Sequence, residues 1–312
     1  MSNTTPLNPQ PKLQIQSQRA TGAWVNGVWQ RFFPPMLIGV VIILMWFGGS
    51  VVLNRQLAED YLHNQGATEV TTEQWVGKAL NLERPKLPTP IQIYRELVRS
   101  LWDEPVASKR SLVYHSFVTL EATLVGAALG VGFGIGLAVL LIYIRSLGAS
   151  LMPWIIASQT VPIIALAPMC VVILNQMHVT GVWPKAVIAA YLSFFPVTLG
   201  MFKGLRAAEK LHLDLMKTYS ANGLTVFLRL RLPASLPFLF ASLKIGVSAS
   251  LVGTVVAELT KSEDGGLGAR LLAGSYYGQT VQIWAALVMA SLGALLLVGL
   301  VSISERAMRI RG

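Results

Sequence analysis

The chain has 312 residues, of which 53% are hydrophobic and only 13% are charged, and its formal net charge is +10. Its single cysteine, Cys170, excludes an internal disulfide and any metal site built from several cysteines. The composition is that of a membrane protein if the apolar residues are gathered in long runs.

Apolar residues are gathered in runs long enough to cross a bilayer. A transmembrane helix needs about 18 or more consecutive apolar residues. Transmembrane barrels instead show short segments of alternating polarity, unlike the continuous run MLIGVVIILMWFGGSVVL. The sequence therefore predicts an all-α membrane protein with about six transmembrane helices, over residues 36–53, 116–143, 151–176, 182–203, 235–259 and 280–303.

The N-terminal part of the chain divides into a tail, a first helix and a loop. Residues 1–35 begin with a polar, proline-containing stretch that is typical of a disordered tail. The apolar run 36–53 has no small-residue cleavage site after it, so we expect an uncleaved first transmembrane helix. Residues 54–112 form a loop, and residues 113–312 form a core of five transmembrane helices.

One amphipathic helix is expected in the loop 54–112. Thr89 is suited to cap its N-terminus, and Pro90 is suited to the first helical position. Apolar residues then recur on one face, at Ile91, Tyr94, Val98, Leu101 and Trp102. We expect this helix to pack on the membrane or on a neighbouring transmembrane helix.

Small residues mark the second apolar block. Gly126, Gly130 and Gly134 lie four residues apart, and Gly132 and Gly136 repeat this spacing. Because glycine lets two helix backbones approach closely in a membrane, this helix is expected to pack tightly against a partner.

Polar residues inside apolar blocks are candidates for a translocation route. The third block contains Ser158, Gln159 and Thr160 next to Pro162, which is expected to bend the helix. These three side chains either line a polar route or bond to adjacent helices. Glu121 either faces a partner or cavity, or lies solvated near the outer end of its span.

Charges are distributed unequally between the two sides of the predicted topology. With a cytoplasmic N-terminus, the inner segments hold thirteen basic and three acidic residues, whereas the outer segments, which include Lys185 and Glu258, hold eleven of each. Lysine and arginine favour the cytoplasmic side, so both termini are expected in the cytoplasm and the loop 54–112 outside. Topology explains the positive charge, and no nucleic-acid partner is indicated. Lys244 lies within the fifth block, and its long side chain is expected to reach the headgroups.

Motifs of catalysis are absent from the sequence. The four histidines, His63, His115, His178 and His212, are scattered singly, without the spacing of a metal site. The sequence contains neither a nucleophile elbow nor a phosphate-binding loop. We therefore expect no catalytic residue, no metal and no cofactor in this chain, and any ATP must be hydrolysed by another subunit. A transporter component is favoured over a scaffold or a channel.

The longest predicted cytoplasmic connection, 204–235, resembles a motif of ABC importer permeases. That motif reads EAA, three residues, Gly, nine residues, Ile, one residue, Leu-Pro. Counted back without gaps from residues 232–233, Ser220 stands at the glycine position and residues 214–216 stand at EAA. Gly223 is the alternative turn residue, although the spacing then falls three residues short. The ungapped match is preferred.

Further short motifs follow along the chain in a fixed order. They are LPTP after the first block, VPIIALAP in the third, FFPVTLGMFKGL at the end of the fourth, LPASLP and VVAEL in the fifth, and GGLG before the sixth. In this order they resemble the nitrate, sulfonate, taurine and pyrimidine-precursor branch of the type I importers, from about residue 85 to the end of the sequence.

The resemblance implies a type I ABC importer permease fold in the bacterial inner membrane. The implied partners are an ABC ATPase that carries ATP and magnesium, a periplasmic solute-binding protein and a second copy of the permease. Residues 204–235 would include a coupling helix that docks into the ATPase, and Leu232 and Pro233 would break the chain before the fifth span. The coupling set is Asp214, Leu215, Met216, Ser220, Asn222, Gly223, Leu232 and Pro233. A basic loop held at anionic headgroups is the alternative for this segment.

The function that the resemblance implies is uptake of a small solute, such as a nitrate-, sulfonate- or taurine-like anion, or a pyrimidine or vitamin precursor. A secondary carrier working without an ATPase is the alternative. Such carriers often show midplane charges and duplicated halves, and neither is clear in this sequence.

Overall fold

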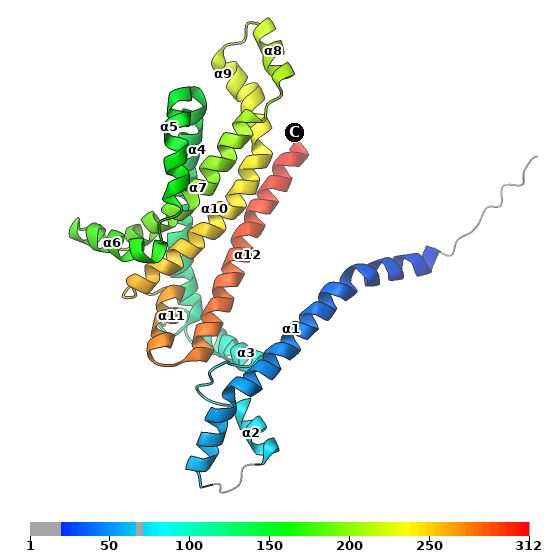
Figure 1. The fold of residues 1–312 in the computed structure, drawn as a ribbon, viewed down its shortest axis with the longest axis vertical. Helices are drawn as coiled ribbons and strands as arrows, with labels where there is room; N and C mark the ends of the chain where they lie inside the picture. Colours follow the sequence, from blue (N-terminus) through cyan, green and yellow to red (C-terminus); the bar gives the residue numbers. More distant parts are fainter. Residues whose placement is uncertain (1–19, 67–70, 312) are drawn as a thin grey trace, which may run out of the picture.

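The computed structural model describes residues 20–66 and 71–311, and every regular element in this part of the chain is helical (Figure 1). Five helices are long and apolar enough to cross a membrane, and there are six spans if two helices that meet at a bend count as one. The predicted all-α fold with about six spans is confirmed. The elements are α1 (Ala20–Asn64), α2 (Thr72–Ala79), α3 (Pro90–Val98), the π-helical turn η1 (Arg99–Asp103), α4 (Leu112–Tyr143), α5 (Arg145–Ser158), α6 (Ile163–Gln176), α7 (Val182–Arg206), α8 (Lys210–Thr218), α9 (Gly223–Val226), the π-helical turn η2 (Phe227–Arg231), α10 (Leu232–Thr260), α11 (Leu267–Tyr276) and α12 (Thr280–Arg311).

Three long helices, α4, α7 and α10, pack together with α7 against both of the others, and we call them the three-helix slab. Glycines of α4 face α7. A Cβ atom on Gly130 would lie 2.7 Å from the carbonyl oxygen of Ala190, and one on Gly134 would lie 2.8 Å from that of Phe194. Gly132, in contrast, has open space at its Cβ position. The predicted close approach is therefore confirmed for the face that carries Gly130 and Gly134.

Glycines also bring α10 against α7. A Cβ atom on Gly253 of α10 would lie 2.9 Å from the Cα atom of Ala189, and one on Gly204 of α7 would lie 3.0 Å from the Cα atom of Ser235. α12 packs on α10 and buries small side chains such as Ala286 in the shared core. Small residues on both sides of α7 thus make the slab a unit of backbone-to-backbone contacts.

The first helix is longer than the apolar run that predicted it. It begins at Ala20 and ends at Asn64, whereas the predicted span covers 36–53. The segment predicted as a tail is accordingly helical from Ala20, and its residues 1–19 lie outside the described part of the chain. Much of α1 extends away from the other helices (Figure 1), so contacts near its C-terminal end attach it to them.

A buried asparagine makes this attachment. The side chain of Asn54 is fully buried, donates from Nδ2 to the carbonyl oxygen of Leu87 at 2.8 Å and accepts the backbone N–H of Lys86 at 2.7 Å. Trp46 donates from Nε1 to the carbonyl oxygen of Pro88 at 3.0 Å. These bonds hold the chain before α3 against α1 and satisfy backbone groups that would otherwise be buried without partners.

The third apolar block does not form one straight helix. α5 and α6 meet at an angle of 99° across a short break, and α6 projects sideways from the slab (Figure 1). Pro162 stands at the N-cap of α6 with an extended ψ of 114°. Proline disfavours the helical conformation in the residue before it and cannot donate a backbone hydrogen bond. The predicted span over 151–176 is thus corrected to two helices, the first of which begins at Arg145.

The predicted amphipathic helix is present as α3, and its cap is the predicted one. Gln92 N donates to the hydroxyl of Thr89 at 3.2 Å, and Thr89 N donates to Oε1 of Gln92 at 3.0 Å. The face that packs on the protein is centred on Ile93, which is buried, whereas Tyr94 is 67% exposed. α3 packs against α12. The predicted apolar face therefore points away from the neighbouring helices.

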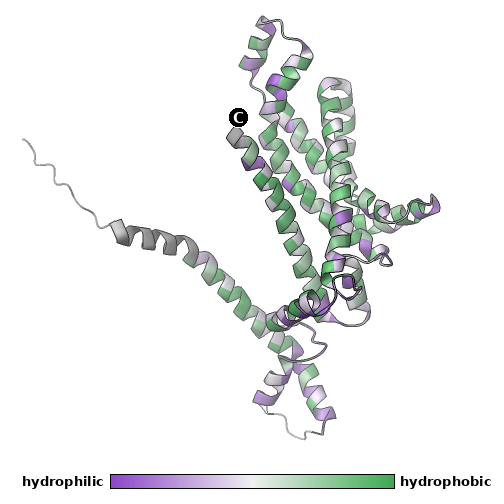
Figure 2. Ribbon diagram, turned by 180° about the vertical axis from the view of Figure 1, so that it is seen from behind, coloured by the Kyte–Doolittle hydropathy of each residue, from purple (hydrophilic) through white to green (hydrophobic). Residues whose placement is uncertain are grey.

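Apolar residues make up most of the long helices, while polar residues are frequent toward the two ends (Figure 2), and many of the apolar side chains are exposed. Leu295 of α12, for example, is 69% exposed. Lipid tails can cover such residues as favourably as a protein core can. We call the end of the slab that carries α8 the α8 end, and the opposite end, beside α11, the α11 end (Figure 1).

Candidate functional site

The predicted coupling segment lies at the α8 end and contains a sharp turn at Ser220. α8 ends at Thr218, and Ser220 has a positive φ of 49°. Its N–H donates to the carbonyl oxygen of Lys217 at 2.9 Å, and the N–H of Ala221 donates to that of Met216 at 3.0 Å. This pair of bonds is a Schellman motif, whose left-handed residue is usually glycine.

Gly223 does not occupy the turn. It is the first residue of α9, and Asn222 caps that helix by accepting the N–H of Thr225 at 2.7 Å. The turn therefore lies at Ser220, where the ungapped match to the importer motif has its glycine. A serine in this conformation carries a steric cost that glycine lacks.

Leu232 and Pro233 do not break the chain before α10. Leu232 is helical, with φ −64° and ψ −50°, and the helix continues from α9 through η2 into α10. A π-helical turn is wider than an α-helical one, and it accommodates a proline that lacks an N–H and would crowd the preceding turn. The predicted break at these two residues is wrong, and the sharp change of direction lies at Ser220 instead.

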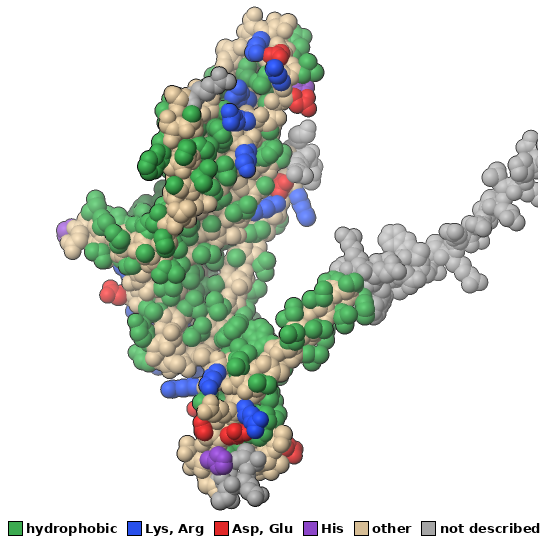
Figure 3. Space-filling view, viewed as in Figure 1, with side chains coloured by type: hydrophobic (Ala, Val, Ile, Leu, Met, Phe, Trp, Pro, Cys, Tyr) green, Lys and Arg blue, Asp and Glu red, His purple; other side chains and the backbone are tan. Residues whose placement is uncertain are grey.

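α8 lies beyond the end of the slab (Figure 1), and it exposes an apolar stripe. Leu211, Leu215 and Tyr219 are spaced four residues apart and are 76%, 52% and 77% exposed. No residue of α8 is buried. Asp214, on the same helix, forms an exposed ion pair with Lys217 at 2.7 Å, and charged side chains surround this end (Figure 3). A stripe of this kind on a charged helix is typical of a surface that another protein covers.

The predicted route residues lie in two separate places. Ser158 ends α5, and Gln159 and Thr160 form the bend before α6. The hydroxyls of Ser158 and Thr160 donate to backbone carbonyls three residues earlier, and Tyr191 of α7 donates to the carbonyl oxygen of Ser158. Glu121 is exposed on α4, and among the described residues no hydrogen bond or ion pair joins it to the other three. The hydroxyls of Ser158 and Thr160 thus donate to backbone carbonyls of α5 and not to groups on adjacent helices.

A buried polar cluster at the α11 end was not predicted from the sequence. Glu258 of α10 is completely buried. Its carboxylate accepts the hydroxyl of Thr119 at 2.9 Å and the backbone N–H of Gly268 at 2.9 Å. The same Thr119 oxygen accepts the N–H of Leu267 at 2.8 Å. The acid therefore holds the start of α11 against α4.

A lysine supplies the opposite charge. Lys185 of α7 is 1% exposed, its Nζ lies 4.0 Å from Oε1 of Glu258, and it donates to the carbonyl oxygen of Gly265 at 3.0 Å. On the other side of the turn, Nδ1 of His115 accepts the N–H of Gly266 at 2.9 Å. We call this group the Glu258 cluster; it comprises His115, Thr119, Lys185, Glu258 and the turn 265–268.

Two positions of this turn require glycine. Gly266 has a φ of 121°, and a Cβ atom there would overlap the carboxylate of Glu258. A Cβ atom on Gly268 would lie 2.7 Å from the Cβ atom of Glu258. The cluster thus fastens the turn before α11 to all three helices of the slab.

Two sequence signals could have found this cluster. Glu258 and Lys185 are charges at the ends of apolar blocks, and GGLG follows in the next turn. The charge count placed both residues in outer segments, but they are buried within the slab. Lys244, which was expected to reach the headgroups, is partly exposed, and its Nζ pairs with the carboxylate of Glu305 on α12 at 2.6 Å.

A charged cavity of about 250 Å³ opens near the same end of the slab. Glu96 and Glu104 line it together with Arg110 and Arg270. Burial lowers the pKa of Arg270 from its usual range, and the negative charges of Glu96 and Glu104 oppose this shift. Charges of both signs are therefore brought together in one recess.

Comparison with known proteins agrees with this arrangement. Residues 130–310, more than half of the chain, match the family described as binding-protein-dependent transport system inner membrane component. A probable ABC transporter permease protein of Haemophilus influenzae is 37% identical over 151 residues, which cover 48% of this chain and 60% of that relative. The formylaminopyrimidine transport permease protein ThiX of Halalkalibacterium halodurans is 30% identical over 179 residues, covering 57% and 67% of the two chains.

A solved structure shares the fold. The MetNI methionine ABC transporter in an inward-facing conformation aligns with a TM-score of 0.54 at 19% identity, over 63% of this chain and 95% of the matched chain. α7, α10, the α8 segment, the turn before α11 and the C-terminal part of α4 lie within the matched family region. The chain therefore belongs to the family of binding-protein-dependent transport system inner membrane components.

Proposed function

We propose that this chain forms the translocation route of an ATP-driven importer and that α8 is the site at which an ATPase subunit docks. The observation that carries the proposal is the exposed stripe of Leu211, Leu215 and Tyr219 on a helix that no other element buries. α8 connects α7 to the helix that continues into α10. A partner that binds α8 therefore acts on both α7 and α10.

The α8 end faces the cytoplasm in this proposal. The excess of lysine and arginine in the connections at this end supports that orientation, because positive residues remain on the cytoplasmic side. The C-terminus of α12 lies at the same end (Figure 1). The N-terminus is also assigned to the cytoplasm, and ATP and magnesium belong to the ATPase.

Solute arrives at the α11 end, where a periplasmic binding protein would dock. The cavity lined by Glu96, Glu104, Arg110 and Arg270 supports this assignment, since neighbouring charges of both signs suit an oriented, reversible protein contact. Two copies of the chain would enclose the route. The solute class is a nitrate-, sulfonate- or taurine-like anion, or a pyrimidine or vitamin precursor, and the name of the formylaminopyrimidine relative supports the pyrimidine alternative.

Co-purification with the ATPase tests the docking site. We expect Leu215→Ser to reduce the amount of ATPase retained by the purified permease, because the substitution removes apolar surface from the stripe. Trp102→Ser is the matched control, since Trp102 is 81% exposed but lies far from α8 in the fold. If both variants retain the ATPase equally well, α8 is not the docking site.

The competing function is secondary transport, in which the chain moves solute without an ATPase. Vesicles containing the purified chain alone would take up a solute from a panel of nitrate, alkyl sulfonates and aminopyrimidines only if the chain were such a carrier. We expect no uptake until the ATPase, ATP and the binding protein are added. Uptake driven by an ion gradient without these partners would replace the importer proposal.

A further inference from the structure

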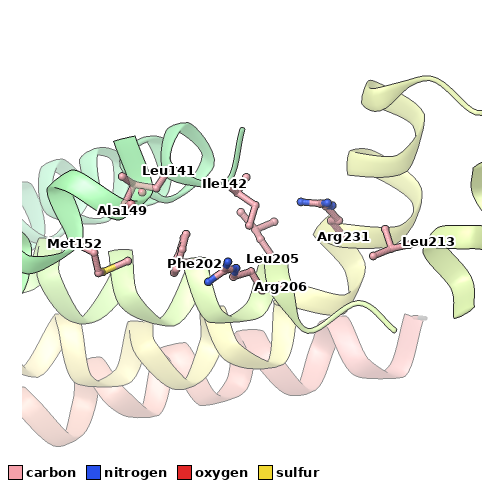
Figure 4. A pocket seen from close by; sticks show the side chains of 10 residues that line it. Leu141, Ile142, Ala149, Met152, Phe202, Leu205, Arg206, Leu213 and Arg231 are labelled. Carbon is pink, nitrogen blue, oxygen red and sulfur yellow. The ribbon is translucent and has the colours of Figure 1, made fainter. Parts of the chain in front are cut away.

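A second cavity, of about 490 Å³, lies at the α8 end of the molecule (Figure 4). Its lining comes from the last turn of α4, the start of α5, the last turns of α7, the middle of α8 and the residue before α10. Four membrane helices begin or end here. The cavity therefore lies at the depth where the spans leave the hydrocarbon and reach the headgroups.

The cavity has a charged side and an apolar side. The guanidinium groups of Arg206 and Arg231 are directed into it from α7 and η2, and no acidic side chain lines it among the described residues (Figure 4). The rest of the wall is mainly apolar, with Leu141, Ile142 and Phe202 among its members. Such a site presents two positive charges next to a surface suited to hydrocarbon.

One of the two arginines is held in place by the wall itself. The guanidinium carbon of Arg206 lies 4.9 Å from the centre of the Phe202 ring, within the range of a cation–π interaction. The other, Arg231, is half-buried beside the start of α10. The C-terminal ends of α4 and α7 and the N-terminal end of α5 all meet here, so the helix dipoles partly offset one another and the arginines set the charge preference.

We propose that this cavity binds the phosphate headgroup of one anionic phospholipid of the cytoplasmic leaflet. Arg206 and Arg231 would hold the phosphodiester, and the acyl chains would lie along the apolar wall. Basic pockets between membrane helices on the cytoplasmic side are suited to anionic headgroups, because arginines near the membrane surface attract the negatively charged lipids of that leaflet. The site connects α4, α5 and α7 to α8, so an occupied cavity joins the lipid to the proposed docking segment. The lipid assignment itself does not require that the chain be an importer.

The test uses the full-length chain in neutral detergent and native mass spectrometry. Phosphatidylglycerol and phosphatidylcholine of the same acyl chains are titrated separately against the parent, Arg206→Gln/Arg231→Gln and Arg229→Gln. Arg229 is the matched control, because it lies in the same π-helical turn, is exposed and does not line the cavity. The unfolding midpoint of each variant without lipid shows that the compared proteins are folded.

We expect one phosphatidylglycerol per chain to bind more tightly than phosphatidylcholine. Each arginine near the membrane surface contributes about fivefold to binding, so the double variant should bind phosphatidylglycerol about 25-fold more weakly. Arg229→Gln should bind as the parent does. Equal affinity for the two lipids, or an equal loss in Arg229→Gln, would overturn the proposal.

Two further arms distinguish other sources of negative charge. Inorganic phosphate at the same concentration should not displace the lipid, and complete displacement would assign the cavity to free phosphate. Assembly with the ATPase should leave the lipid bound. Release of the lipid on assembly would mean that acidic side chains of the ATPase occupy the cavity, and the lipid assignment would be overturned.

Discussion

Close packing of α4 on α7 can be tested by one added methyl group at two positions of the same helix. Gly130→Ala places a Cβ atom 2.7 Å from the backbone carbonyl oxygen of Ala190, whereas Gly132→Ala places it in open space. A backbone oxygen cannot rotate away as a side chain can, so α7 has to shift. Overpacking of this kind costs about 1–3 kcal/mol.

Helix propensity acts equally on both variants. Replacing glycine by alanine inside a helix gains up to about 1 kcal/mol, so the difference between the variants isolates the steric cost. Gly132→Ala should be as stable as the parent or slightly more stable, and Gly130→Ala should be less stable than Gly132→Ala by about 1–3 kcal/mol. Thermal unfolding of the purified chain in detergent measures this as a lower midpoint for Gly130→Ala, by about 2–4 °C for each kcal/mol. Equal midpoints for the two variants would refute the packing argument.

The remaining predictions concern the Glu258 cluster and the turn after α8. Glu258→Gln leaves Lys185 buried without its charge partner and should destabilise the chain by about 3–5 kcal/mol, while adding Lys185→Met should restore much of the loss; denaturant unfolding in detergent checks this, and a fully stable single variant would contradict it. Gly266→Ala should abolish stable folding or lower the unfolding midpoint strongly, whereas Gly278→Ala, also at a positive φ of 64° but with open space around it, should cost only about 1–2 kcal/mol. Ser220→Gly should stabilise the turn by up to about 1 kcal/mol, since glycine has no penalty in the left-handed region; slower hydrogen exchange at the C-terminal end of α8 would report this, and unchanged or faster exchange would argue against it.

Features that depend on local sequence were predictable. The spans follow from the length of apolar runs, and the cap of α3 follows from Thr89 and Pro90, whose preferences act within a few residues. The glycine face of α4 also follows from spacing alone. Its partner helix does not, because the sequence shows that a close approach is possible without showing which backbone approaches.

Features that depend on distant parts of the chain were missed. Glu258 and Lys185 become a pair only when α7 and α10 pack together, so a count of charges along the chain placed them in outer segments. The break at Pro162 was expected as a bend within one span, but the angle of 99° depends on where α6 can pack. At Pro233 the error is the opposite one: a break was predicted, but the preceding π-helical turn accommodates the proline and the helix continues without a change of direction.

The residues of the predicted coupling set lie on or next to two different helices in the structure. Asp214, Leu215 and Met216 lie on α8, and Ser220 ends it, but Leu232 and Pro233 belong to the helix that leads into α10. The ungapped match to the importer motif placed the motif's glycine at Ser220, and the structure has its left-handed turn residue at that position. The sequence spacing does not show which protein covers the exposed apolar stripe of α8.

Backbone-to-backbone packing in the three-helix slab determines how a mechanical load on α8 would spread. Interfaces made of long side chains can yield by rotamer changes, but glycine and alanine contacts leave nothing to rearrange. α7 and α10 flank α8 in the chain and are pressed together at Gly204 and Gly253. A displacement of α8 is therefore expected to tilt the slab as one stiff plate, and any deformation is expected in the bent pair of α5 and α6 or along α1, which are less tightly held.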